Sequence, residues 1–449
     1  MRNNRRLTWL AAAAALLLAA QAHAILPIQH WQAKSGARVY FVENRNLPMF
    51  DLSVEFPAGA GYDTREKSGA ASMTSQLLRL GAGGMSEDEI ARQLADVGAQ
   101  LSPQFEADRA GLALRTLSGA AERRQALDIY ARVLQQPEFP AAVLEREKVR
   151  LISALKEADT KPETIAALSF SRLVYREHPY ALRSTGEAGT VSTLTREDLA
   201  AFYRRHYVAQ RAVVAIIGDL SREEAAAIAE QVTAGLPQSA GSEPQLPPVA
   251  ALDAGSTRII SHPALQSHIL IGAPGISRGD ADYFTLFVGN YVLGGGGFVS
   301  RITEEVRQKR GLAYSAYSYF APQLQRGPFV IGMQTQRDQA QEALAVVQKT
   351  LRDFINDGPT EKELTAAKQN IVGGFPLRID SNRKIHGYLA LIGFYRLPLT
   401  YLDDFVKNVE SVSVAGIKSA FARRIDPDKL VTVVVGAAED KTVTSLTTH

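Results

Sequence analysis

The stretch LGGGGFVSRITEEVRQKRGLAYSAYSYF, residues 293–320, decides how this chain folds. Its four consecutive glycines can take positive φ angles, which is typical of a turn. Residues 298–310 then have the spacing of a helix, and Gly311 is placed to end it. The apolar side of this helix consists of Phe298, Val299, Ile302 and Val306. After Gly311 the period changes to two, which predicts a strand. One face of the strand would carry Tyr314, Ala316, Ser318 and Phe320.

The N-terminus has the form of a secretory signal peptide. Residues 1–6 (MRNNRR) are basic, an alanine- and leucine-rich apolar run follows, and Ala22-His23-Ala24 fits a cleavage site. The alternative is a membrane anchor, but the apolar run is short for a span. We therefore expect residues 1–24 to be removed, and the mature chain to be periplasmic without membrane contact.

Composition excludes several classes of function. Loss of residues 1–24 removes three arginines and no acidic residue, which takes the formal charge from +3 to zero and argues against nucleic acid as a partner. The chain has no cysteine, so disulfides, thiolate catalysis and Cys-bound zinc are impossible. Its 449 residues, 46% of them hydrophobic, are too many for one ordinary domain and suggest two.

The second half of the chain repeats the first. Residues 191–207 (VSTLTREDLAAFYRRHY) resemble 409–424 (VESVSVAGIKSAFARR), and each segment is followed by an apolar strand that ends in glycine. Between the halves, residues 237–256 are rich in Pro, Ser and Gly, which indicates a linker. We predict an α+β chain with homologous domains at 25–236 and 257–449, each an antiparallel sheet with helices on one face. Among local signals, Ser86 followed by Glu89 predicts a helix start.

The segment LGGGGFVSRITEEVRQKRGLAYS, inside a tandem pair of such domains, resembles the pitrilysin/insulinase family of metallopeptidases, and the mitochondrial processing peptidases in style. The resemblance covers essentially the whole mature chain, including the paired VxxLTxEDLxxFYxxxY…GD endings. It implies that the two domains form half of a clam-like chamber, which a homologous subunit completes.

In that family, zinc is held by H-x-x-E-H on a helix of the first domain and by a glutamate downstream. The resemblance maps the two histidines onto Ser72 and Gln76, the general base onto Ser75, and the downstream glutamate onto Ala154. Serine and glutamine are poor zinc ligands, and no carboxylate is left to activate water. The histidines beyond residue 24 offer no H-x-H, H-x-x-H or H-x-x-x-H pair. We therefore expect no metal in this chain, and zinc in a partner that carries H-x-x-E-H.

The second-domain signature of the family is present. The resemblance maps its substrate-binding arginine and tyrosine onto Arg307 and Tyr314. A guanidinium can hold a peptide carbonyl or carboxylate, and a phenol can donate to the oxyanion that forms at a scissile carbonyl. Outside the family context, the same two residues read as a helix-end charge and a sheet residue. The glycine run is either a packing turn or a loop that touches substrate or partner; it consists of Gly294, Gly295, Gly296 and Gly297.

Three functions are compatible with these residues. The first is a non-zinc-binding subunit of a heterodimeric periplasmic metallopeptidase, which orients peptide substrates with Arg307 and Tyr314. The second is a non-enzymatic peptide-binding or scaffold protein derived from the same fold, and the third is a peptidase that acts alone with unusual ligands. We predict the first, because a purely structural protein has no need of Arg307 and Tyr314 at this spacing.

Overall fold

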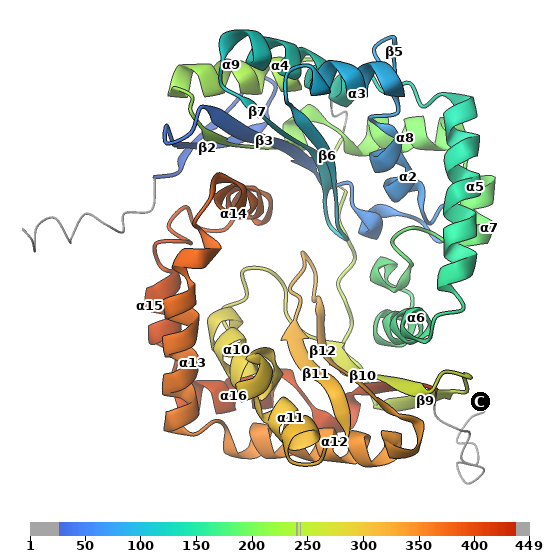
Figure 1. The fold of residues 1–449 in the computed structure, drawn as a ribbon, viewed down its shortest axis with the longest axis vertical. Coiled ribbons are helices and arrows are strands. Elements are labelled where there is room, and N and C mark those ends of the chain that lie inside the picture. Colours follow the sequence, from blue (N-terminus) through green and yellow to red (C-terminus); the bar gives the residue numbers. More distant parts are fainter. Residues whose placement is uncertain (1–26, 239–240, 243, 437–449) are drawn as a thin grey trace, which may run out of the picture.

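Two β-sheets, one in each half of the chain, form the frame of the molecule (Figure 1). The computed structural model describes residues 27–238, 241–242 and 244–436, so the predicted signal peptide lies outside the described residues. The N-terminal sheet has the strand order β1 (Gln29–Gln32), β2 (Arg38–Glu43), β8 (Val213–Gly218), β3 (Met49–Phe56), β7 (Ala110–Leu117), β6 (Gln100–Phe105). The C-terminal sheet has the order β11 (Ala313–Phe320), β12 (Pro328–Gln336), β10 (Gln266–Pro274), β13 (Val431–Val435), β9 (Ser256–Ile260). A separate hairpin joins β4 (Gly81–Ala82) to β5 (Met85–Ser86).

The two sheets share one plan. The series β2-β8-β3-β7-β6 in the first matches β9-β13-β10-β12-β11 in the second. Neighbouring strands are antiparallel, except that β2 runs parallel to β8 and β9 runs parallel to β13. Strands β8 and β13 are buried along their whole length, which is why their sequences read as apolar runs without alternation. The predicted α+β class with mainly antiparallel sheets is confirmed, and the parallel pair in each sheet is an addition to it.

Helices cover the outer face of each sheet (Figure 1). The helices that cover or flank the N-terminal sheet are α2 (Ala70–Leu77), α3 (Glu87–Ala95), α4 (Ala120–Gln135), α5 (Ala141–Ala158), α7 (Ala188–Thr193), α8 (Arg196–His206) and α9 (Arg222–Thr233). In the C-terminal half they are α10 (Tyr283–Asn290), α11 (Arg301–Thr303), α12 (Ala340–Asp357), α13 (Glu361–Gly374), α15 (Phe405–Glu410) and α16 (Val414–Arg424). The helix start predicted at Ser86 is confirmed, because Ser86 and Glu89 form a reciprocal capping box at α3.

The two halves exchange one helix each. Helix α6 (Pro162–Tyr175) leaves the N-terminal half and packs on β10 and β13, where Phe170 and Val174 join a core with Val433. Helix α14 (Asn382–Tyr395) leaves the C-terminal half and packs on β8, β3 and β2 (Figure 1). Its Gly393 lies so close to the N-terminal sheet that an added Cβ would approach Val213 to 2.6 Å. The inner face of each sheet is therefore covered in part by the other half of the chain.

A buried carboxylate ties the exchanged segments together. Asp108, at the turn between β6 and β7, is 1% exposed. It accepts hydrogen bonds from the hydroxyl of Tyr180, from the hydroxyl of Tyr395 on α14 at 2.8 Å, and from the backbone N–H of Leu324 at 2.7 Å. Because these donors come from both halves, Asp108 links the N-terminal hairpin to the C-terminal half.

The segment predicted as a linker contains no helix, and only its last residue, Ser256, belongs to a strand, within its described part. It is nevertheless packed: Leu246, Val249 and Leu252 are buried in the core that α6 forms with the C-terminal sheet. In the described part of the chain, no helix combines the length and apolar character needed to cross a bilayer.

Candidate functional site

Helix α2 carries three of the positions that the resemblance maps onto the zinc motif. Ser72 and Gln76 are half-buried, and Ser75 is buried. The helix is fixed at its start by Asp63, whose carboxylate accepts from the backbone N–H groups of Gly69 and Ala71, both at 2.8 Å. Burial raises the pKa of Asp63 to about 7, against the opposing effect of these two hydrogen bonds. The N-terminus of α2 is therefore held by a buried acceptor that the sequence did not single out.

The side chain of Gln76 is already engaged. Its amide Nε2 donates to Glu147 Oε2 of α5 at 3.1 Å. Glu147 is 4% exposed, and its carboxylate also accepts from Arg146 Nε at 2.9 Å and lies 3.7 Å from Arg150 Nη1. A buried carboxylate needs compensation, and here an amide and two guanidinium groups supply it. No metal cation is required to balance the charge of Glu147.

These residues do not fit a zinc ion. The hydroxyls of Ser72 and Ser75 and the engaged amide of Gln76 are not the neutral imidazole, thiolate or carboxylate donors that zinc binds. Ala154, the fourth position, is exposed on α5 and has no donor atom. Across residues 27–436, apart from the three that the structure leaves out, no group of three or more His, Asp or Glu side chains could hold a metal.

Restoring the donors should restore zinc binding if these positions are the family's ligand positions. We expect the triple variant Ser72→His, Gln76→His, Ala154→Glu to bind about one Zn²⁺ per chain, because histidines at i and i+4 lie on one helix face and a carboxylate completes the set. Elemental analysis after dialysis against zinc measures the content. A matched control carries Ser153→Glu in place of Ala154→Glu, since Ser153 is the exposed neighbour on the same helix. Equal zinc contents in the two triples would contradict the assignment.

Tyr314 lies at a β-bulge, which the period of two did not predict. In the register of β11 against β12, Ala313 pairs with Thr335 and Ser315 pairs with Gln334, so Tyr314 is the extra residue. A bulge re-aims its extra side chain away from the regular faces of the sheet. Tyr314 is accordingly 79% exposed, whereas Ala316 and Ser318 are buried. The prediction that Tyr314 shares a strand face with these two residues is therefore wrong.

Arg307 lies beside Tyr314. Its guanidinium carbon is 4.9 Å from the centre of the Tyr314 ring and 4.7 Å from that of Phe298, so the cation sits between two aromatic rings. The neighbouring cations Lys309 and Arg310 are ion-paired to Glu305. Within the described residues, Arg307 has neither a carboxylate partner nor a hydrogen bond, so its N–H donors are available. A cavity of about 350 Å³ opens at Arg307 and Tyr314.

The helix predicted over residues 298–310 is interrupted, and part of its predicted apolar side is wrong. The chain forms a single turn at Gly297–Val299, then α11, then a wider turn, η6 (Glu304–Gln308). Ile302 and Val306 are buried as predicted, but Phe298 and Val299 are 65% and 74% exposed because they precede the break at Ser300. Phe298 is thereby free to stack on Arg307.

The glycine run covers the free edge of β11. A Cβ on Gly294 would lie 2.6 Å from the backbone nitrogen of Ser318, so only glycine allows this approach. Next to it, Asn290 Nδ2 donates to the Ser318 carbonyl at 2.9 Å, and Thr303 Oγ1 donates to the Ala316 carbonyl at 3.1 Å. Of the two interpretations, Gly294 fits the packing turn. Gly297 has a φ of 62° and open space around it, in front of the exposed Phe298.

The fold and the substituted site define a protein built like a zinc metallopeptidase but without the zinc donor set. The chain belongs to peptidase family M16. The family model described as "Insulinase (Peptidase family M16)" matches residues 38–186, and the one described as "Peptidase M16 inactive domain" matches residues 193–371. The family resemblance read from the glycine run and the RGLAY segment is thereby confirmed.

Relatives support the same conclusion. A peptidase M16 inactive domain from Pseudomonas fluorescens, known from a crystal structure, is 38% identical in sequence to this chain. The match covers 92% of this chain and 98% of that protein's chain, with a TM-score of 0.88. A protein named "Non-peptidase homolog YmxG" from Helicobacter pylori is 24% identical over 401 residues, 88% of this chain and 91% of its own length. The periplasmic protease PqqL from Escherichia coli shares the fold, with a TM-score of 0.77 and 13% identity, and this chain covers 46% of it.

Proposed function

We propose that this chain is the non-zinc-binding subunit of a heterodimeric periplasmic metallopeptidase, and that it holds and orients peptide substrates with Arg307 and Tyr314. The observation that carries the proposal is the contrast between the two sites. The zinc-motif positions have none of the donors that zinc prefers, and Gln76 is engaged by Glu147. By contrast, the half-buried Arg307 and the exposed Tyr314 are adjacent, and neither has a hydrogen-bond partner among the residues that the structure describes.

In this proposal the two chains divide the chemistry. A homologous subunit that carries H-x-x-E-H supplies zinc and the attacking water. Arg307 of this chain donates to a substrate carbonyl or carboxylate, and the Tyr314 hydroxyl donates to the oxygen that gains charge as the peptide bond is attacked. The bulge at Tyr314 supports this role, because it directs the phenol out of the sheet. The signal-peptide prediction, together with the periplasmic relative in the same fold, supports the compartment.

A second candidate is a non-enzymatic peptide-binding or scaffold protein with the same fold. The name of the Helicobacter relative, a non-peptidase homolog, favours it. The two candidates differ in what Arg307 and Tyr314 do: a scaffold needs neither side chain for turnover.

Mixing the two chains tests the proposal. The homologous chain with H-x-x-E-H, sought among the genes beside this one, is purified alone and with this chain, and cleavage of internally quenched peptides is followed. We expect the chains to co-purify and the mixture to cleave at least about ten times faster than either chain alone, since donors aimed at the transition state are worth this much or more. The control is a partner with its motif glutamate changed to glutamine. Full activity of the partner alone, unchanged by this chain, would overturn the proposal.

A further inference from the structure

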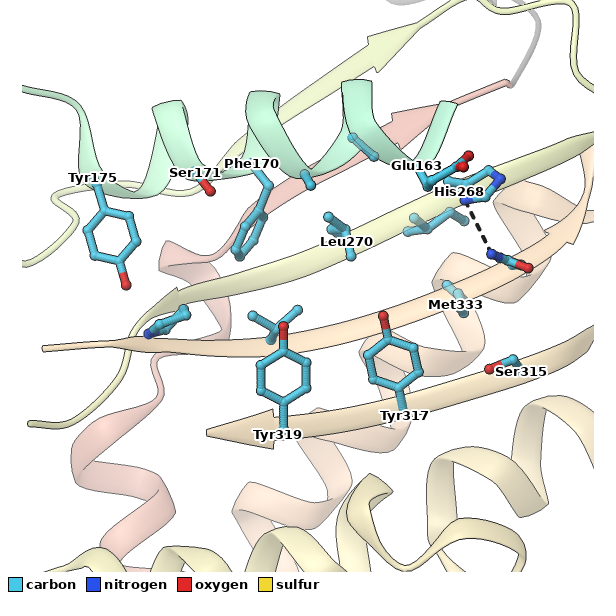
Figure 2. Close-up of a pocket in the computed structure, with 16 residues that line it drawn as sticks. Glu163, Phe170, Ser171, Tyr175, His268, Leu270, Ser315, Tyr317, Tyr319 and Met333 are labelled. Carbon is cyan, nitrogen blue, oxygen red and sulfur yellow. Dashed lines mark hydrogen bonds between the residues drawn. The ribbon is translucent and has the colours of Figure 1, made fainter. Parts of the chain in front are cut away.

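A groove runs between α6 and the inner face of the C-terminal sheet (Figure 2). Its volume is about 280 Å³. Helix α6 packs over β10 and β13, and the side chains of β11 and β12 stay open beside it. Figure 2 shows Tyr317 and Tyr319 projecting side by side from β11 toward α6, with Phe170 across from them. The two tyrosine rings are stacked 6.0 Å apart, and each residue is 41% exposed.

Two glycines on the inner face of the sheet shape this groove. Gly332 of β12 pairs with Tyr317, and a Cβ there would lie 2.5 Å from the Tyr317 ring. Gly272 of β10 would place a Cβ 2.9 Å from the ring of Phe170. The sheet therefore has glycine at two inner positions where larger residues would push these rings outward. The result is an aromatic slot large enough for one sizeable apolar side chain.

The other end of the groove is polar and acidic. Across the sheet, Ser315 pairs with Gln334 and Gln334 pairs with His268, whose Nδ1 lies 3.4 Å from the Gln334 amide. Glu163, near the start of α6, lies next to His268 (Figure 2). Glu163 has no ion-pair partner in the described part of the chain. Burial lowers the pKa of His268, against the opposing effect of Glu163, which favours the neutral imidazole.

The polar end adjoins the cavity at Arg307 and Tyr314. Gln334 lines both cavities, and Ser315 follows Tyr314 directly. A ligand that extends from Arg307 along β11 first meets Tyr314. It then meets the polar end of the groove beside Glu163, and after that Tyr317 and Tyr319. Successive residues on one strand face are about 7 Å apart, which is also the spacing of alternate residues in an extended peptide. The carbonyls of Ala316 and Ser318 on the edge of β11 already accept hydrogen bonds from side chains, so a ligand cannot pair with them as an added strand. The groove must therefore hold such a ligand through side-chain contacts.

We infer that this groove selects the peptide: it takes an extended segment with a basic side chain beside Glu163 and an aromatic side chain two residues on, between Phe170 and Tyr317. The inference rests on the proposed function, because it extends the peptide held at Arg307 and Tyr314. A carboxylate that forms no ion pair with any described residue is complementary to lysine or arginine, and stacked tyrosines beside an apolar floor are complementary to a ring.

Binding of short peptides to this chain alone tests the inference. Three fluorescein-labelled octapeptides share one threonine-rich frame and contain Lys-Thr-Phe, Glu-Thr-Phe or Lys-Thr-Thr, and anisotropy titrations at low salt give their Kd values. We expect the Lys-Thr-Phe peptide to bind at least about ten times more tightly than the other two, because each loses one complementary contact. Equal affinity for the three peptides would overturn the inference.

Two variants assign the preference to the groove. Glu163→Gln should reduce the preference for lysine over glutamate to about threefold or less, while Glu361→Gln, a matched exposed acid in the first turn of α13, should leave it unchanged. Gly332→Ala should remove the preference for phenylalanine by filling the slot, without deleting any contact residue. An unchanged lysine preference in Glu163→Gln would place the binding elsewhere. Because no partner chain is present, this result is independent of the mixing experiment.

Discussion

Cleavage by the mixed complex is expected to fall about 100-fold when Arg307 is changed to alanine, and by a similar factor when Tyr314 is changed to phenylalanine. Each change removes one donor that acts on the substrate as charge develops. Tyr314→Phe keeps the ring that stacks on Arg307 and deletes only the hydroxyl, so it separates hydrogen bonding from packing. The measurement is kcat and KM for one quenched peptide, with zinc content and co-purification determined in parallel.

The control for this series is Arg310→Ala. Arg310 lies three residues from Arg307 but is ion-paired to Glu305, so its loss removes a similar surface charge without removing a free donor. We expect normal turnover from this variant. A fall in kcat with unchanged KM in the Tyr314 variant would indicate a contact made only in the transition state. Normal turnover by the Arg307→Ala, Tyr314→Phe double variant would rule out the division of chemistry between the two chains.

Asp108→Ala should destabilise the protein by about 3–5 kcal/mol, the largest stability effect that we expect from a single polar residue. The change leaves the hydroxyls of Tyr180 and Tyr395 and the N–H of Leu324 without their common acceptor. The midpoint of urea unfolding, followed by circular dichroism, measures the effect. Asp253→Ala is the matched control, because among the described residues Asp253 forms a single ion pair, with Arg176, which is exposed, and its loss should not move the midpoint. Equal midpoints for the two variants would show that Asp108 does not join the halves.

The local elements were predictable because their signals lie close together in the sequence. The capping box at Ser86 and Glu89 and the apolar run of β8 depend on neighbouring residues, and both are found in the structure. The family could be recognised for the same reason: the glycine run and the RGLAY segment are contiguous. The class of the fold and the loss of zinc donors could therefore be inferred from the sequence alone.

What could not be predicted depends on contacts between distant segments. The bulge at Tyr314 is a property of the register with β12, which the sequence of β11 alone does not contain. The apolar stripe of α6 shows that the helix is buried but not that it is buried on the other half of the chain. Asp108 is a single aspartate in a turn, and nothing near it indicates three donors from remote segments.

The exchange of α6 and α14 determines when this protein can complete its core during synthesis. Strand β8 ends at Gly218, but the helix that covers β8 begins at Asn382. During the synthesis of the intervening residues, the apolar inner face of the N-terminal sheet has no cover, and such faces are the usual starting points of aggregation. A nascent chain of this protein must therefore be kept from self-association until residues 382–395 emerge, and a fragment that stops at the linker lacks the helix that covers the inner face of its sheet.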